Sequence, residues 1–225
     1  NHGGRAGVGY HPRQGTVTHP RCSRMDRRAL ANPSTKWNII TVRVLSCMAI
    51  VRPEDSEILN VVDADDRVTG QCRRDEVHRL GLRHRAIHAL IFNDSGQVFL
   101  QKRAQHKQEN PGLWDSSVAG HVDAGESYNQ CCRREIGEEV GLVVTHTPER
   151  LFKLPAGPLT GMEFCWIYRL VTDQKLQLDY TEIETGDWFT VESVDNWVFE
   201  TPDQLAESFR LIWSRYRDRQ ELAPG

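Results

Sequence analysis

Residues 120–142, GHVDAGESYNQCCRREIGEEVGL, constrain the fold more strongly than any other segment of the chain. Ser127 followed by Gln130 is the pattern of a capping box, which predicts that a helix begins there. Gly141 predicts the end of that helix, because glycine adopts the left-handed conformation of a C-cap without strain. The segment therefore predicts one helix over residues 127–140, preceded by a loop that Gly120 and Gly125 allow to bend.

The predicted helix carries an unusual concentration of acidic side chains. At about 100° per residue, Glu135, Glu138 and Glu139 share one arc, because residues three or four apart lie on the same face. The apolar residues form a neighbouring stripe of Cys132, Ile136 and Val140. Carboxylates this close repel one another unless a cation joins them. Mg²⁺ is the natural partner because it prefers oxygen ligands and binds phosphates.

A solvent-exposed acidic helix is the alternative explanation, and the preceding loop argues against it. Gly120 and Gly125 bend the chain just before the helix, so a backbone carbonyl or Glu126 can return to the same cation. Arg134 is placed to pair with a carboxylate of the loop and to hold the loop in position. These features favour a metal site over an exposed face.

The same spacing resembles the Nudix box at every defined position. The matching residues are Gly120, Glu126, Arg134, Glu135, Ile136, Glu138, Glu139, Gly141 and Leu142. The resemblance extends from about residue 57 to residue 213. It implies an α/β/α sandwich in which a mixed β-sheet is flanked by helices. It also implies hydrolysis of the diphosphate linkage of a nucleoside diphosphate-type or related small molecule, with Mg²⁺, or Mn²⁺ as a substitute.

The resemblance also implies which residues hold the metal. Glu135, Glu138 and Glu139 would be ligands, together with the carbonyl oxygen of Gly120. Glu126 would support the metal ligands from outside or act on the metal through water. Arg134 would orient the carboxylates.

A base must accept the proton of the attacking water, and four glutamates remain open for this role. Glu138 and Glu139 lie on the predicted helix. Glu182 and Glu184 lie in the later loop TEIETGDW, and some family members use a remote glutamate. The sequence does not choose between them.

A second resemblance, over RHRAIHALIFNDSGQVFLQKRAQHKQENPGLWDSSVAGHV, is to the Nudix subgroup that contains isopentenyl diphosphate isomerase. That enzyme binds a metal through histidines and a glutamate, and His84, His121 and Glu163 stand at matching places. It also uses a cysteine, whereas residues 116–119 here read SSVA. The resemblance therefore favours a hydrolase, with an isomerase-like enzyme or a non-catalytic nucleotide-sensing domain as alternatives.

Further side chains are candidates for substrate contacts or for packing. Lys102 and Arg103 leave a predicted strand near the site, where they would meet substrate phosphates or remain solvated. His84 and His88 alternate on one strand and so face the same side. Trp114 is expected in the core, although stacking on a base is the alternative.

The remaining pattern predicts a mixed sheet with helices. Two short strands flank the turn at residues 63–66, and DEVHRLGL predicts a short helix. A hairpin is predicted over residues 86–102, with its turn at residues 93–96. GDWFTV predicts a strand. An amphipathic helix is predicted over residues 201–218, with one apolar face formed by Leu205, Phe209, Ile212, Trp213 and Tyr216.

Composition sets broad limits on location and partners. The net charge of −3 gives no reason to expect a nucleic acid polymer as partner, and no apolar run is long enough to predict a membrane segment. The six cysteines form no CxxC pair, which indicates reduced thiols and a cytoplasmic protein. Residues 1–47 are predicted to be a disordered extension and residues 48–225 a single domain. A small-molecule diphosphate is the expected partner, and a homodimer is possible.

Overall fold

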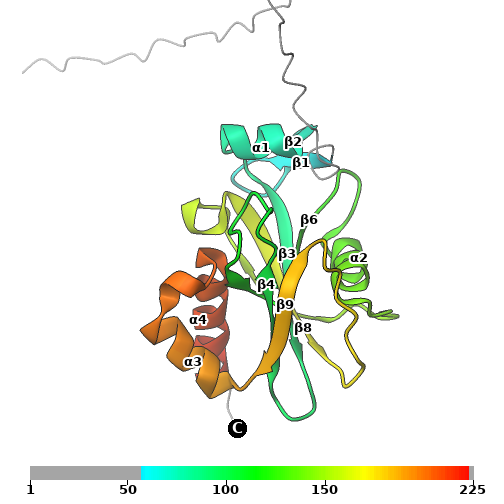
Figure 1. The fold of residues 1–225 in the computed structure, drawn as a ribbon. Coiled ribbons are helices and arrows are strands. Elements are labelled where there is room, and N and C mark those ends of the chain that lie inside the picture. Colours follow the sequence, from blue (N-terminus) through cyan, green and yellow to red (C-terminus); the bar gives the residue numbers. More distant parts are fainter. Residues whose placement is uncertain (1–56, 223–225) are drawn as a thin grey trace, which may run out of the picture. The chain divides into compact units, whose positions relative to one another are not determined.

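A mixed β-sheet forms the centre of the fold in the computed structural model, which describes residues 57–222 (Figure 1). Its strands are β3 (His84–Phe92), β4 (Val98–Arg103), β5 (Trp114–Asp115), β6 (Val118–His121), β7 (Glu149–Leu154), β8 (Glu163–Val171) and β9 (Ile183–Phe189). Strands β3 and β8 are parallel, and the other paired strands of this sheet are antiparallel. The predicted mixed sheet is therefore confirmed. The predicted disordered extension at residues 1–47 lies outside the described residues, as do positions 48–56 and 223–225 of the predicted domain.

Helices cover both faces of this sheet (Figure 1). Helix α2 (Tyr128–Val140) packs on one face, and α3 (Val191–Glu200) and α4 (Glu207–Glu221) pack on the other. A separate two-stranded sheet of β1 (Ile58–Val62) and β2 (Val68–Arg73) precedes α1 (Arg74–Leu80). Two short 3₁₀ turns complete the elements, η2 (Pro158–Thr160) and η3 (Pro202–Gln204). This arrangement is the predicted α/β/α sandwich.

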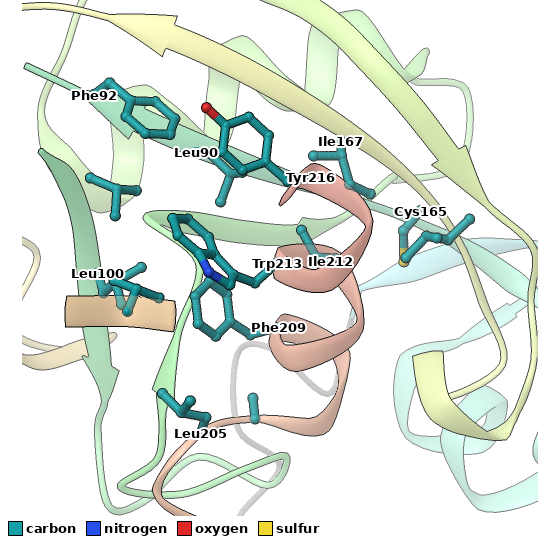
Figure 2. Close-up of a cluster of buried hydrophobic side chains, with 14 of the residues drawn as sticks. Leu90, Phe92, Leu100, Cys165, Ile167, Leu205, Phe209, Ile212, Trp213 and Tyr216 are labelled. Carbon is teal, nitrogen blue, oxygen red and sulfur yellow. The ribbon is translucent and has the colours of Figure 1, made fainter. Parts of the chain in front are cut away.

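Strand β3 contributes side chains to both hydrophobic cores, one on each face of the sheet. Leu90 and Phe92 face α4, whereas Ile87, Ala89 and Ile91 face α2, because successive side chains of a strand point to opposite faces. Figure 2 shows the core on the α4 side, where aromatic residues of the helix lie against the strands. The predicted apolar face is buried at all of its positions, Leu205, Phe209, Ile212, Trp213 and Tyr216.

The boundaries near the C-terminus differ from the prediction. The predicted helix over residues 201–218 is instead a 3₁₀ turn followed by α4, which begins at Glu207. Leu205 is extended, and the backbone N–H of Ala206 donates to the carbonyl of Trp114 at 2.9 Å. This hydrogen bond to β5 keeps Leu205 and Ala206 out of the helix, so α4 begins at Glu207.

Helix α3 was not predicted, and the predicted strand GDWFTV ends earlier than expected. Strand β9 ends at Phe189, and the side chain of Thr190 accepts a hydrogen bond from the backbone of Ser193. This is an N-cap, so a helix begins where the strand pattern was extended. The threonine and serine spacing was a visible signal for it.

The predicted hairpin forms, but its strands diverge. Strands β3 and β4 pair only beside the turn, at Ile91 with Phe99 and at Phe92 with Val98. Further along, β3 pairs with β6, and β4 pairs with β9 and β5. The divergence leaves β3, β4 and β6 all bordering the cavity described below. No helix within residues 57–222 is both long and apolar enough to cross a bilayer.

Asp66 attaches the β1–β2 hairpin to the main sheet. Its carboxylate accepts hydrogen bonds from Arg85 Nε at 2.6 Å and from the Tyr128 hydroxyl at 3.0 Å, and it pairs with the ammonium group of Lys153. Burial acts to raise the pKa of Asp66, but the hydrogen bonds from Lys153, Arg85 and Tyr128 outweigh it and lower the pKa. The position of the hairpin therefore depends on an ionised Asp66.

Replacing Asp66 with asparagine should destabilise the fold. Asp66 has a φ of 61°, which asparagine tolerates, so the substitution removes the charge without adding backbone strain. We expect a loss of about 1–3 kcal/mol in unfolding free energy at pH 7. Because folding lowers the pKa of Asp66, its charge stabilises the fold at neutral pH, and this stabilisation is lost as the pH falls through the lowered pKa. The difference in unfolding free energy between the wild type and the variant should therefore shrink below about pH 4. Urea unfolding at both pH values measures this. Asp65→Asn, in the same turn but exposed, is the control, and an equal loss there would contradict the assignment.

Candidate active site

A cavity of about 330 Å³ lies where β3, β4, β6 and α2 meet. The predicted site residues that line it are Arg103, Gly120, His121, Arg134, Glu135, Glu138, Glu139, Glu163 and Glu182. His88 also lines it, as do residues that were not predicted, among them Arg74 and Lys107. The cavity thus joins the metal-site residues predicted on one helix to side chains from distant parts of the chain.

Helix α2 forms as its caps predict. The Ser127 side chain accepts a hydrogen bond from the backbone N–H of Gln130, and the Gln130 side chain accepts one from the backbone N–H of Ser127, which is a complete capping box. Gly141 is left-handed, with a φ of 69°. Because both ends of the helix are set locally, the rotation of its acidic arc toward the cavity depends on the apolar stripe. Cys132, Ile136 and Val140 are fully buried in the core on this side of the sheet.

One guanidinium group organises the acidic residues. Arg134 donates to both carboxylate oxygens of Glu126, at 3.0 and 2.9 Å. It also donates to Glu135 at 2.7 Å and to Glu138 at 3.0 Å. A further bond of 3.0 Å reaches the carbonyl of His121. The predicted pairing of Arg134 with a loop carboxylate is confirmed.

Glu135 and Glu139 face the cavity as buried carboxyl groups. Glu135 lies against Gly120 so closely that a Cβ on that residue would overlap its carboxyl group. Glu139 accepts a hydrogen bond of 2.9 Å from Gln101. Burial raises the pKa of Glu135 to about 8, and burial together with Glu135 raises the pKa of Glu139 well above its usual range. A divalent cation placed among these groups would favour their ionised forms.

This arrangement fits a divalent cation with oxygen ligands. Buried carboxylates of like charge are stabilised when a cation neutralises them, and Mg²⁺ and Mn²⁺ favour such donors. Glu135, Glu138, Glu139 and the carbonyl of Gly120 are the groups that would hold it. Glu126 does not line the cavity and is bonded to Arg134, so it holds the loop that precedes α2 in place.

A second group of candidate metal ligands adjoins the same cavity. His78 of α1, His84 of β3, His121 of β6 and Glu163 of β8 place their ligand atoms within 4.8 Å of one another. His84 Nδ1 lies 2.9 Å from the carbonyl of Leu82 and must donate to it, which leaves a lone pair on Nε2. That Nε2 is buried and has no hydrogen-bond partner among residues 57–222. We refer to these residues as the histidine cluster.

The protonation states of the histidine cluster also suit a metal. Burial lowers the pKa of His121 to about 3, and burial and His84 lower that of His78. Burial acts to raise the pKa of Glu163, but its contacts with His121 Nε2 at 3.1 Å and His84 Nε2 at 3.4 Å hold it well below its usual range. Neutral imidazoles beside an ionised carboxylate are the forms that bind metals. Nitrogen donors favour Mn²⁺, Fe²⁺ or Zn²⁺ over Mg²⁺.

Cationic side chains complete the cavity wall. Arg74 and Lys107 line it although only 5% and 8% of their surfaces are exposed. Lys107 Nζ lies 2.6 Å from Glu182 Oε2. Arg103 lies 4.0 Å from Asp115. Buried cations beside buried carboxylates suit a ligand that carries both phosphate groups and a metal ion.

Lys102 and Glu184 are placed elsewhere. Lys102 Nζ lies 2.8 Å from Glu184 Oε1, and neither residue is among those of the described chain that line the cavity. The alternation along β4 explains this, since Gln101 and Arg103 take the side that faces the cavity. Trp114 packs against Phe189 and Trp197, as expected for a core residue.

His88 is buried on the same strand as His84, as the alternation predicted. Its Nδ1 lies 2.9 Å from Ser116 Oγ, which is a structural hydrogen bond. Its backbone lies opposite Ala119 in the β3–β6 pairing, and both residues line the cavity. His88 therefore contributes to the floor of the cavity.

Sequence patterns did not identify His78, Arg74 or Lys107 as site residues. His78 lies in the predicted helical segment DEVHRLGL, which Arg74 directly precedes, and Lys107 lies in the loop AQHKQENPG. Neither segment has a spacing that links it to the acidic helix. Their positions depend on how α1 and the loop pack against the sheet. The one local signal was the short stretch of sequence between His78 and His84, which allows the two side chains to lie close together.

The match to a family model decides the relationship. The NUDIX domain model matches residues 82–210. The chain belongs to the Nudix family. This match includes the acidic helix, the cavity strands and the start of α4, so the predicted family is shown.

Individual relatives fall into two groups. This Nudix chain is 32% identical over 163 residues to an isopentenyl-diphosphate Delta-isomerase of Pectobacterium atrosepticum, covering 70% of this chain and 90% of that one. It is 43% identical over 97 residues to an uncharacterized Nudix hydrolase of Streptomyces coelicolor, covering 43% and 54%. The crystal structure of DR0079 from Deinococcus radiodurans aligns with a TM-score of 0.64 and 27% identity, covering 71% of this chain and 98% of that one. The predicted likeness to the isomerase subgroup is therefore confirmed.

Gly120→Ala should disrupt the acidic site. The added Cβ would overlap the Glu135 carboxyl group, so Glu135 or β6 must move. We expect Mg²⁺ or Mn²⁺ affinity to fall by about 10–100-fold, as when the support of a metal ligand is removed. Calorimetric titration with each cation measures this.

Gly70→Ala is the matched control, because a Cβ there meets no atom within 4 Å. It should leave the affinity unchanged. Unaltered affinity in Gly120→Ala would show that the cation does not bind beside Glu135.

Proposed function

We propose that this Nudix chain is a divalent-metal-dependent hydrolase of small molecules that contain a diphosphate. The observation that carries the proposal is the complete acidic site on α2, held by Arg134, in the wall of a cavity that cationic side chains also line. The carboxylates would hold the cation. Arg74, Arg103 and Lys107 would contact phosphate oxygens, because ammonium and guanidinium groups form charge-assisted hydrogen bonds with them.

The reaction transfers a phosphoryl group to water. The water oxygen forms a bond to phosphorus, the bridging P–O bond breaks, and the departing oxygen leaves with the negative charge. When bound, a divalent cation neutralises phosphate charge and lowers the pKa of water. The chain must bind the diphosphate, orient the water and accept its proton.

Glu182 is the best placed of the four candidate bases. In the proposal Glu138 and Glu139 hold the cation, so neither is the first choice as the base. Glu184 does not line the cavity. Glu182 lines it, and its side chain is 37% exposed. In the proposal, its carboxylate accepts the proton that the water loses.

An isomerase-like activity is the second candidate, and the histidine cluster is the observation that favours it. Such an enzyme also needs a group to donate a proton to an alkene, and residues 116–119 offer no thiol. Cys165 donates to Glu163 at 3.5 Å, but it is fully buried. Burial and Glu163 raise the pKa of this thiol well above its usual range. The cysteine is therefore poorly placed for proton transfer, which favours the hydrolase.

Hydrolysis of a panel of diphosphate compounds with Mg²⁺ should distinguish the candidates. The panel contains nucleoside diphosphates, nucleotide sugars, dinucleotides and isopentenyl diphosphate. We expect release of phosphate or nucleotide from at least one compound. Glu138→Gln should lower the rate by about a hundredfold, because it removes the charge of a metal ligand but keeps its size.

The control is Glu200→Gln, an exposed glutamate at the end of α3, which should behave as the wild type. Isomerisation of isopentenyl diphosphate without phosphate release would favour the second candidate. Saturable nucleotide binding without turnover, unchanged in Glu138→Gln, would indicate a sensing domain.

A further inference from the structure

Lys107 and Glu182 form an ion pair with each other. The proposed reaction needs the ammonium group to bind phosphate and the carboxylate to accept a proton. The Lys107 side chain is 7% exposed and its Nζ lies 2.6 Å from Glu182 Oε2. Both residues line the cavity. The carboxylate oxygen that accepts this hydrogen bond is not available to water. The ammonium group is likewise engaged before any phosphate arrives.

The backbone holds the two residues at this distance. The N–H of Ala104 donates to the carbonyl of Glu182 at 3.0 Å, and the N–H of Lys107 donates to the carbonyl of Ala104 at 3.1 Å. The loop that carries Lys107 is therefore joined to the start of β9. Only side-chain rotation is needed to separate the two charges, and lysine has a long, flexible side chain that permits it.

We propose that Lys107 exchanges partners when substrate binds, and that this exchange frees Glu182 to act as the base. A diphosphate carries more charge than a carboxylate and competes for the ammonium group. Once Lys107 contacts a phosphate oxygen, Glu182 accepts the proton of the attacking water as the water oxygen bonds to phosphorus. The inference rests on the proposed hydrolase function, which it deepens by coupling substrate binding to base release.

A similar pair outside the cavity provides an internal comparison. Lys102 Nζ lies 2.8 Å from Glu184 Oε1, and Gln105 donates to the other oxygen of Glu184 at 2.8 Å. Neither charged residue lines the cavity. Removing the Glu184 charge should therefore not alter diphosphate binding, although it changes the net charge by the same amount as removing the Glu182 charge.

A binding cycle with methylene diphosphonate, a diphosphate whose bridge is not hydrolysed, tests the exchange. Calorimetry with Mg²⁺ present compares the wild type with Glu182→Gln, Lys107→Gln and the double variant. Lys107→Gln should weaken binding by about tenfold, the value of one charge-assisted hydrogen bond. Glu182→Gln should tighten binding by about threefold or more, because one charged competitor for Lys107 is removed. This gain should be absent in the Lys107→Gln background and in Glu184→Gln.

Kinetics supply a second readout. With the compound that the wild type hydrolyses best, Glu182→Gln should lower kcat by about 10²–10⁴-fold, as for loss of a general base, while its binding of the diphosphonate is tighter. Lys107→Gln should chiefly raise KM, and Lys107→Arg should restore most of the affinity. Thermal unfolding confirms that each variant is folded.

Several results would overturn the inference. Glu182→Gln that leaves binding unchanged or weakens it would mean that the two groups do not compete. A gain that persists without Lys107, or that Glu184→Gln reproduces, would reflect net charge alone. If the chain hydrolyses a diphosphate and the cycle shows no coupling, only this inference fails. If no compound is hydrolysed, the proposed function fails whatever the cycle shows.

Discussion

The guanidinium group of Arg134 makes it possible to place several carboxylates side by side at the edge of a hydrophobic core. Its planar group of donors matches carboxylate geometry, and it remains charged at any pH at which the protein is folded. By holding Glu126 and Glu135 together with the carbonyl of His121, it fixes both the helix and the loop before it. The apolar stripe of α2 sets the rotation of the helix, and this one side chain joins its acidic residues to the loop.

Two neighbouring residues of strand β6 belong to two different groups of candidate metal ligands. Gly120 pairs with Ile87 and lies under Glu135, on the α2 side of the sheet. The next residue, His121, pairs with Ala86 and joins the histidine cluster. Because successive strand residues face opposite sides, one short strand serves an oxygen-donor site and a nitrogen-donor site that border the same cavity. Oxygen donors favour Mg²⁺, and imidazole donors favour transition metals.

The parts of the molecule that the sequence predicted are those with local causes. The caps of α2, its acidic arc and the apolar face of α4 follow from residue spacing within one turn or a few turns. The Arg134–Glu126 pair was also predictable, because only eight residues separate the partners.

The parts that were missed depend on long-range packing. His78 meets His121 across 43 positions of sequence, and Lys107 meets Glu182 across 75. Lys102 lies away from the cavity for a similar reason, since pairing with β9 fixes which side of β4 faces it. Helix α3 is different, since the Thr190–Ser193 cap was visible in the sequence. The predicted roles of the site residues, the homodimer and the cytoplasmic location remain predictions.

Anomalous diffraction from crystals grown with Mn²⁺ would show directly whether the carboxylates of α2 hold a cation. We expect an anomalous peak in contact with Glu135, Glu139 and the carbonyl of Gly120, with Arg134 still bonded to Glu126. A peak confined to the histidine cluster at saturating Mn²⁺, with the α2 carboxylates unchanged, would contradict the claim that these carboxylates form the catalytic metal site.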